Sequence, residues 1–451
     1  MPFAEAFNRR RFVQAGSTTL LGLGLPALLA GREASTTTQT QRGRNRSVIL
    51  VLLSGGPSQL DTFDPKPDAP VEIRGEFKPI ATSVPGIQIC EHLPLLAANM
   101  RRWAVVRSFS HGENGHLPGT HRLLTGAPMP LQRITDLDNI LSRRDFPCYA
   151  AGLNHVRPRH DGIPNGVTLP HALIEGSLIW PGQHAGFLGP QHDPVLVTQN
   201  PAASDFRMDT FQLPPGVDST RLKDRLDLLD RIGNTSAGGD PFQKHRELAY
   251  EVLSSGKVTQ AFRLEREPDR VRERYGRNMF GQSLLLAKRL VDAGVPIVQA
   301  NMGIVQSWDT HVDNWGRLKN RLLPWLDRGL KALVDDLHDQ GKLDDTLVVV
   351  MGEFGRTPRV SNLPGEKIPG RDHWAYVYSG LFAGGGVQGG RVIGSSDRIA
   401  AHPNSPSYTP YDVGATIYQA LGVETDAELR DSLNRPLRLN SGQPIAALFK
   451  S

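Results

Sequence analysis

Aliphatic runs the length of single strands alternate along this chain with longer stretches in which apolar residues recur at helical spacing. The runs 48–53 and 346–351 are apolar at nearly every position, which is typical of strands buried inside a parallel sheet. Apolar residues three or four apart in 219–294 and 314–340 predict amphipathic helices with charged outer faces. Strands that alternate with helices predict an α/β protein with a largely parallel central sheet.

Shorter segments extend this pattern, and no internal repeat is evident. Further strands are predicted at 103–108, 296–300 and 375–383, and further helices at 93–100, near 117 and at 411–422. The glycines of 384–394 follow a strand instead of opening a helix. This segment is therefore predicted to be a hairpin and not a phosphate-binding loop.

The segment 127–215 departs from the pattern and carries many Pro and Gly residues. We expect it to be an irregular insertion into the α/β domain. Its polar and aromatic part, 179–194, either covers the functional site and sets its specificity or elaborates the surface. The sequence leaves both alternatives open.

The first residues have the layout of an export signal. Arg9 and Arg10, followed by Phe12, precede an uncharged stretch at 15–30 that is shorter than a membrane span. We predict a twin-arginine signal peptide at 1–34, a polar linker at 35–47 and one domain at 48–451. The mature protein is then expected in the periplasm or at the cell surface, with no stable membrane span.

Composition narrows the class of protein. The 451 residues include 39% hydrophobic and 22% charged residues, as in soluble globular proteins, and the formal charge is only +5. No basic block other than Arg9–Arg11 and no basic stripe interleaved with aromatic residues is present, so nucleic acid is not an expected partner. Cys90 and Cys148 lack metal-binding spacing. They form either one disulfide in an exported protein or two buried thiols.

Three polar clusters follow apolar runs, and each places chemistry where a strand ends. Glu353 follows the strand 346–351, Asp309 and His311 follow 296–300, and the third cluster holds Asp372 and His373. Ligands of open α/β sheets bind beyond the carboxyl ends of the strands. Carboxylate with neutral imidazole is the ligand set of zinc, manganese or iron, whereas carboxylate alone favours magnesium or calcium.

The clusters therefore predict a site for one or two divalent ions. Asp309 and His311 are two residues apart, so an extended backbone turns both side chains to one side, and His373 completes a three-ligand site. Glu353 with Asp61 would hold a second ion, and Asp372 is a further candidate ligand. Two ions clamp the attacking and leaving oxygens of a displacement at phosphorus. Arg356 is expected to pair with an anionic oxygen of the substrate.

A fourth segment, 109–126, holds His111, His116 and His121 together with one Glu and several hydroxyl groups. Polar loops at strand ends are often functional, and we predict that this one contributes His116 to the chemistry. The alternative is a solvated loop that precedes a helix.

Several of these segments together resemble one family over almost the whole chain, the DUF1501 family of exported bacterial proteins, which is abundant in planctomycetes. The resemblance rests on residues 53–67 (LSGGPSQLDTFDPKP), 124–126 (LTG), 182–183 (GQ) with 186–189 (GFLG), 309–311 (DTH), 353–358 (EFGRTP) and 370–374 (GRDHW). The family is grouped with the alkaline phosphatase and sulfatase superfamily. The resemblance implies a three-layer αβα sandwich and metal-dependent hydrolysis of phosphate or sulfate esters.

The chain departs from the superfamily pattern at three places. Phe354 stands where the superfamily has a histidine beside the strand-end carboxylate, and no carboxylate lies at 54–58, so that Asp61 is the nearest substitute. These departures put a second metal in question and leave both one ion and two ions open. The sulfatase motif Cys/Ser-x-Pro-x-Arg is absent, which leaves Ser110 and Thr120 as candidate nucleophiles, or else a metal-bound water.

Three functional hypotheses follow. The first is an exported metal-dependent hydrolase of phosphate or related anionic esters, acting on a small molecule or a glycan. The second is a non-catalytic relative that binds sulfated or phosphorylated glycans at the cell surface. A sulfatase that lacks the modified residue is the third. Trp180, Trp308 and Trp374 would suit stacking on a sugar, although packing in the core is the commoner role of tryptophan.

Overall fold

The computed structural model describes residues 46–130, 143–208, 216–217, 219–233, 256–431 and 433–449. Several predictions lie outside these residues. They are the signal peptide at 1–34, the linker up to residue 45, two parts of the segment 127–215 (131–142 and 209–215), and the helical stretch at 234–255.

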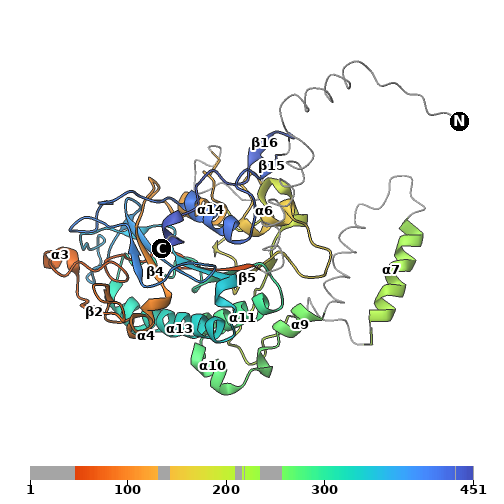
Figure 1. The fold of residues 1–451 in the computed structure, drawn as a ribbon, viewed down its shortest axis with the longest axis horizontal. Coiled ribbons are helices and arrows are strands. Elements are labelled where there is room, and N and C mark those ends of the chain that lie inside the picture. The colour runs from red at the N-terminus through yellow and green to blue at the C-terminus, as the bar shows by residue number, and fades with distance from the viewer. Residues whose placement is uncertain are drawn as a thin grey trace, which may run out of the picture. The chain divides into compact units, whose positions relative to one another are not determined.

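An eight-stranded sheet forms the centre of the described residues (Figure 1). Its order is β14 (Arg391–Ile393), β4 (Ala104–Phe109), β13 (Tyr378–Ala383), β10 (Thr346–Met351), β1 (Ser47–Leu52), β9 (Ile297–Asn301), β5 (Gly166–Leu169) and β8 (Val195–Leu196). β13 runs antiparallel to both of its neighbours, and all other pairs are parallel. The predicted α/β class with a largely parallel sheet is confirmed.

Side chains of the central strand β1 alternate between two hydrophobic cores, one on each face of the sheet. Ile49 and Val51 point into the first core, and Val48, Leu50 and Leu52 point into the second. α4 (Pro94–Ala98), α11 (Met279–Asp292) and α13 (Leu323–Asp339) cover the first core, and α5 (His116–Thr125), α6 (Tyr149–Val156) and α14 (Pro410–Ala420) cover the second (Figure 1). The three-layer αβα arrangement follows directly from strands that are apolar on both faces.

Short elements connect these layers. The helical ones are α3 (Val71–Arg74), η2 (Met100–Arg102), η4 (Gly186–Leu188), η5 (Pro190–His192), α7 (Ser219–Gly233), α9 (Lys257–Ala261), η7 (Leu264–Arg266), α10 (Asp269–Tyr275), α12 (Asn314–Arg317), η8 (Leu318–Leu322), η9 (Leu343–Asp345) and η10 (Ala446–Leu448). The short strands pair as β2 (Pro79–Ala81) with β3 (Gln88–Cys90), β6 (Ile174–Glu175) with β7 (Leu178–Ile179), β11 (Gly355–Arg356) with β12 (His373–Trp374), and β15 (Glu428–Arg430) with β16 (Pro436–Arg438).

The long helix predicted at 314–340 is interrupted. It consists of α12, the π-helical turn η8 and then α13. Pro324 lies in the first turn of α13 and has no backbone N–H to donate to the turn before it. The missing hydrogen bond accounts for the wider turn at this point.

Two predictions about the sheet are wrong. The segment 384–394 is not a hairpin, because β14 pairs in parallel with β4, and β4 lies between β14 and β13. The segment 127–215 is not wholly irregular, since it supplies β5 and β8 to the main sheet. Short strands next to Pro and Gly carry too few residues to show a periodicity.

The two cysteines do not form a disulfide. Cys90 lies in the first core and Cys148 in the second, on opposite faces of the sheet. Burial raises the pKa of each thiol to about 12. Of the two alternatives, the structure therefore has the two buried thiols.

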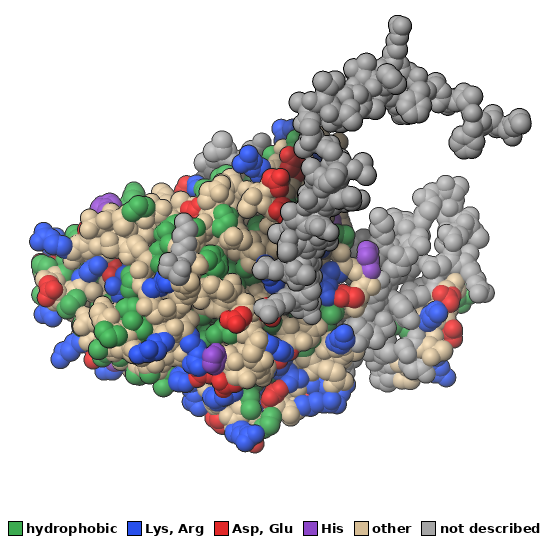
Figure 2. Space-filling model, in the orientation of Figure 1, with side chains coloured by type: hydrophobic (Ala, Val, Ile, Leu, Met, Phe, Trp, Pro, Cys, Tyr) green, Lys and Arg blue, Asp and Glu red, His purple; other side chains and the backbone are tan. Residues whose placement is uncertain are grey.

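The surface agrees with the composition. On the face shown in Figure 2, Lys and Arg side chains are interspersed with Asp and Glu and form no continuous basic stripe. Among the described residues, no helix combines the length and the apolar character that crossing a bilayer requires.

Candidate metal centre

Loops that follow the neighbouring strands β10, β1 and β9 meet the loop that follows β4 at one edge of the sheet. β10 leads to Glu353, β9 leads to Asp309, and β4 leads to His116 at the first position of α5. His373 lies on β12, which pairs with β11 just after Glu353. This is the edge at which open α/β sheets bind their ligands.

Gly55 allows these loops to approach one another closely. Its φ is +111°, and a Cβ atom there would lie 2.4 Å from the backbone nitrogen of Asp309. The same loop accepts a hydrogen bond from the Trp308 N–H at the carbonyl of Ser54, 2.9 Å away. Only glycine combines this backbone conformation with this contact. The loop after β1 therefore fixes the position of Asp309.

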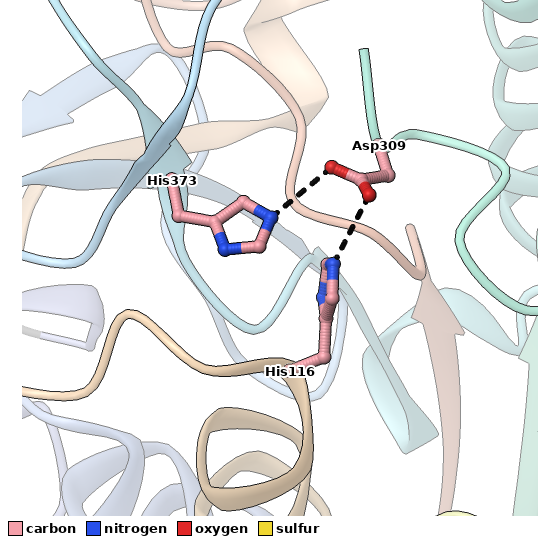
Figure 3. Close-up of side chains that lie close together, drawn as sticks. All are labelled: His116, Asp309 and His373. Carbon is pink, nitrogen blue, oxygen red and sulfur yellow. Dashed lines mark hydrogen bonds and ion pairs between the residues drawn. The ribbon is translucent and has the colours of Figure 1, made fainter. Parts of the chain in front are cut away.

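Asp309 is the centre of the site (Figure 3). Its Oδ1 lies 3.1 Å from His311 Nε2 and 3.2 Å from His373 Nε2, and its Oδ2 lies 3.3 Å from His116 Nε2. The ligand atoms of His116, Asp309 and His373 all lie within 4.8 Å of one another. One carboxylate and two imidazoles that converge in this way form a donor set for a transition metal.

The outer nitrogen of each imidazole is bound to an oxygen. His116 Nδ1 lies 2.8 Å from Glu353 Oε1, His311 Nδ1 lies 2.7 Å from Asp372 Oδ1, and His373 Nδ1 lies 2.7 Å from the carbonyl oxygen of Asn114. Carbonyl and carboxylate oxygens only accept, so each Nδ1 carries the proton and donates it. When such a ring is neutral, its Nε2 therefore has a free lone pair, and this lone pair faces Asp309. This arrangement is typical of histidines that bind metals.

Two observations show that this point of convergence requires a positive charge. His311 Nε2 and His373 Nε2 lie only 2.9 Å apart, and two bare lone pairs at that distance repel each other unless a proton or a cation lies between them. In addition, the buried Nε2 of His116 makes no hydrogen bond and faces the carboxylate of Asp309. A metal ion held by His116 and His373 would use the Nε2 lone pairs of both and leave the Nε2 of His311 as the group that can carry a proton, so the donor set fits a metal.

The charges of the site act on the pKa values of its members. Burial lowers the pKa of His116, but the carboxylates of Asp309 and Glu353 outweigh burial and raise that pKa to about 9. Burial also opposes ionisation of Asp309, yet contacts with His116, His311 and His373 hold its pKa well below the usual range. A metal that bound here would replace the proton on His116.

Two predicted ligands, Glu353 and Asp372, lie behind the imidazoles. Glu353 is fully buried and contacts Nδ1 of His116, whereas Asp309 faces Nε2 of the same ring. Asp372 contacts the Nδ1 side of His311 and also accepts a hydrogen bond from Ser361 Oγ at 3.0 Å. Both carboxylates therefore hold imidazoles in place.

Asp61 is bound elsewhere. Its carboxylate pairs with the fully buried guanidinium of Arg371 at 2.7 Å, and it also accepts hydrogen bonds from Ser58 Oγ, Asn314 Nδ2 and Trp315 Nε1. Four protein donors occupy its oxygens. The structure gives Asp61 the role of counter-charge to Arg371.

Arg356 does not face a substrate, contrary to expectation. Its guanidinium is fully buried and donates to the carbonyl oxygens of Gly55, Gly56, Trp308 and Arg371 as well as to the carboxylate of Asp309. All of these acceptors belong to the loops that carry the site. Arg356 therefore fixes the geometry of the site and is not available to an anionic oxygen of a ligand.

The two predicted nucleophiles are not part of the converging group. Thr120 lies one turn after His116 on α5, and its buried hydroxyl has no hydrogen-bond partner among the described residues. Ser110 follows β4, where its N–H donates to the carbonyl of Tyr408. Neither hydroxyl makes a hydrogen bond to Asp309 or the imidazoles.

The other histidines of the segment 109–126 have different surroundings. His111 is turned the opposite way: its Nε2 contacts the carbonyl oxygen of Glu353 at 2.7 Å, and its Nδ1 accepts from the Glu113 N–H. Burial lowers the pKa of His111, which keeps this ring neutral. His121 is fully buried. Of the three, only His116 belongs to the donor set.

Aromatic residues enclose His116. The ring of Trp180 stacks on it with centroids 5.1 Å apart, and the ring of Phe354 lies 5.0 Å from it. Trp180 and Trp308 are fully buried, so the idea that they stack on a sugar is wrong, whereas Trp374 is partly exposed. No spacing in the sequence indicates the contact between Trp180 and His116.

The donor set predicts specific loss of bound metal. We expect wild-type protein to bind Zn²⁺. Residues that only hold a metal ligand in place contribute roughly 10–100-fold to metal affinity. Because Asp309 and His373 would bind the ion directly, Asp309→Asn and His373→Ala should each weaken Zn²⁺ binding by more than that. Chelator competition and elemental analysis measure this. His338→Ala, at the exposed end of α13, is the control and should bind like wild type. Equal metal content in all four proteins would contradict the assignment.

The surroundings of Asp61 predict lost stability without lost metal. Asp61→Asn leaves the buried guanidinium of Arg371 without its counter-charge, so the free energy of unfolding should fall by about 3–5 kcal/mol. Urea denaturation measures the change, and Asp68→Asn on the exposed surface is the control. Loss of Zn²⁺ from a folded Asp61→Asn protein would show instead that Asp61 is a ligand.

The raised pKa of His116 predicts a pH dependence of the metal-free protein. Because that pKa is about 9 in the folded chain and 6.5 ordinarily, the folded state holds the proton more tightly. The stabilisation of the folded state is complete below pH 6.5 and disappears as the pH rises through 9. At 1.36 kcal/mol for each unit of difference in pKa, it amounts to about 3 kcal/mol at most. Urea denaturation in chelator measures it, and His116→Gln should flatten the profile. The same dependence of stability on pH in wild-type protein and in His116→Gln would refute a raised pKa of His116.

The sequence profile of the family described as "Protein of unknown function (DUF1501)" matches residues 45–449. No curated protein matches the chain in a sequence comparison.

Among solved structures, the chain is similar to murine ectonucleotide pyrophosphatase/phosphodiesterase 5, with a TM-score of 0.41 and 9% identity over 84% of this chain and 96% of that one. A protein in the alkaline phosphatase superfamily from Vibrio parahaemolyticus has a TM-score of 0.37 and 13% identity, over 84% and 67%. The PsFucS1 sulfatase from Pseudoalteromonas sp. has a TM-score of 0.35 and 11% identity, over 86% and 70%.

Proposed function

The chain belongs to the DUF1501 family, and we propose that this member is a metal-dependent hydrolase of phosphate or related anionic esters, sulfate esters included. The observation that carries the proposal is the convergence of His116 Nε2, His373 Nε2 and the Asp309 carboxylate on one point. A protein that only bound glycans would have little need for three imidazoles whose outer nitrogens are all held by oxygens.

Three side chains would hold the ion, namely His116, Asp309 and His373. Two imidazoles with one carboxylate suit zinc or manganese, and three protein ligands leave coordination positions for water and substrate. A metal of this kind polarises an ester oxygen and lowers the pKa of water. We propose a single ion, because Asp61 and Glu353, the residues considered for a second ion, are both engaged with protein donors.

His311 would serve as the acid–base group. Its side chain is 26% exposed, which makes it the most accessible imidazole of the cluster, and its Nε2 lies beside Asp309. Asp372 fixes the ring through Nδ1, and Ser361 in turn holds Asp372. Held in this way, Nε2 is positioned to take a proton from an attacking water or to return one to the leaving oxygen.

A second candidate function is a non-catalytic protein that binds sulfated or phosphorylated glycans. The specific observation in its favour is that Arg356, whose guanidinium contacts Asp309, is fully used by the protein and so cannot stabilise charge that develops on a reacting ester. Among the residues that the structure describes, no Ser or Thr hydroxyl makes a hydrogen bond to a side chain of the donor set. In a hydrolase, water that attacks directly would replace a hydroxyl nucleophile, and the charge of the metal would replace that of a free arginine.

Export by the twin-arginine route is part of the proposal. Arg9 and Arg10 carry it, together with the uncharged stretch that follows them. Replacing both arginines by lysine should retain the protein in the cytoplasm, as cell fractionation would show. Secretion that is unaffected by this change would refute the route but not the hydrolase.

The hydrolase proposal predicts that Zn²⁺- or Mn²⁺-loaded protein turns over nitrophenyl phosphate, bis(nitrophenyl) phosphate or nitrophenyl sulfate. Loss of the acid–base group in His311→Ala should lower kcat by about 10²–10⁴-fold while elemental analysis still finds the metal. Asp372→Asn, which keeps His311, should lower kcat less. Metal-loaded wild-type protein that cleaves none of these esters but binds sulfated or phosphorylated glycans would establish the second function.

A further inference from the structure

The side chain of Glu353 has an arrangement that the metal centre by itself does not explain. Both of its oxygens accept from the backbone N–H of Gly55, at 2.8 and 3.1 Å, and Oε1 also accepts from His116 Nδ1 at 2.8 Å. The side chain is fully buried. Its negative charge is thus directed at one backbone donor and one imidazole.

Glu353 and Asp309 contact opposite nitrogens of the same ring. His116 Nδ1 faces Glu353, and Nε2 faces Asp309 Oδ2 at 3.3 Å. Because the two nitrogens of an imidazole point outward in different directions, a proton fixed on Nδ1 leaves the lone pair on Nε2. Glu353 therefore determines which nitrogen of His116 can bind a metal.

The ring cannot easily turn to exchange its two nitrogens. Trp180 stacks on it, Phe354 packs at 5.0 Å, and both are fully buried. On the next turn of α5, a Cβ atom at Gly119 would lie 3.4 Å from the Cβ of Glu353, so the helix packs closely on the aliphatic part of that side chain. The choice of nitrogen is thus left to the hydrogen bond with Glu353.

We infer that Glu353 is a positioning residue for the metal centre, which holds His116 in the tautomer that binds a metal and does not itself bind the ion. This inference rests on the proposed metal site and assigns Glu353 a role different from the ligand role expected from the sequence. Carboxylates that hold metal-binding imidazoles typically contribute 10–100-fold to metal affinity.

Glu353→Gln tests this with little change in shape. An amide has one accepting oxygen and one donating nitrogen. If the oxygen accepts from Gly55, the nitrogen faces His116 Nδ1, donates to it and moves the imidazole proton to Nε2, which can then no longer bind the metal. We expect the affinity for Zn²⁺ alone, measured by chelator competition, to fall about 10–100-fold. Affinity within about twofold of wild type would overturn the inference.

A double-mutant cycle separates positioning from direct binding and from a general effect on the fold. In a His116→Ala background, Glu353→Gln should change Zn²⁺ affinity by less than about twofold, since there is no ring left to orient. A full-sized loss in that background would mean that Glu353 binds the ion or that the substitution damages the fold. That result would overturn the inference.

The tautomer supplies a readout that a purely structural role would not change. In Zn²⁺-loaded wild-type protein, ¹⁵N NMR of the imidazole nitrogens should show His116 protonated at Nδ1, with the signal assigned by its absence from His116→Gln. A proton on Nε2 would overturn the inference. Protein that binds Zn²⁺ as expected but cleaves no ester would refute the proposed hydrolase and leave the role of Glu353 intact.

Discussion

The site depends on the buried guanidinium of Arg356. Its donors reach the loop after β1 through Gly55 and Gly56, the loop after β9 through Trp308 and Asp309, and the segment before β12 through Arg371. A fully buried cation needs its hydrogen bonds and a counter-charge, and these acceptors supply both. Three loops that are separate in sequence are thereby held around one carboxylate, and the imidazoles take their places relative to it.

This constraint explains why the carboxylates of the site differ in role. Asp309 carries the counter-charge of Arg356 and also faces the imidazoles. Asp61 serves Arg371, and Glu353 serves His116 and Gly55. Each buried carboxylate is therefore matched to a buried donor, and only Asp309 lies where the imidazole lone pairs converge. This distribution of charges supports the proposal of a single metal ion.

The sequence predicted the class of fold well because the pattern of buried strands is local. The runs that became β1 and β10 are apolar at successive positions, and the structure places them side by side in the centre of the sheet. The pairing of β14 with β4 could not be predicted, because it joins segments almost 300 residues apart and nothing in the glycine-rich run records its partner.

The candidate site was predictable in its members but not in their roles. Carboxylates and histidines at strand ends were visible, and Asp309, His311, His116 and His373 do come together. Which nitrogen of a ring faces inward depends on acceptors such as the carbonyl oxygen of Asn114, which every residue possesses and which no sequence pattern marks. The same holds for Arg356, whose partners are almost all backbone oxygens.

The donors of the metal centre are far apart along the chain. His116 and Glu353 are 237 residues apart. Both must be in place before the lone pair on His116 Nε2 faces the site. An unfolded chain therefore offers an ion only scattered and weak ligands, so that metal uptake comes after the sheet and its loops have assembled. An ion bound at this site would consequently be selected by the compartment in which the chain completes its folding, and not by the compartment in which it is synthesised.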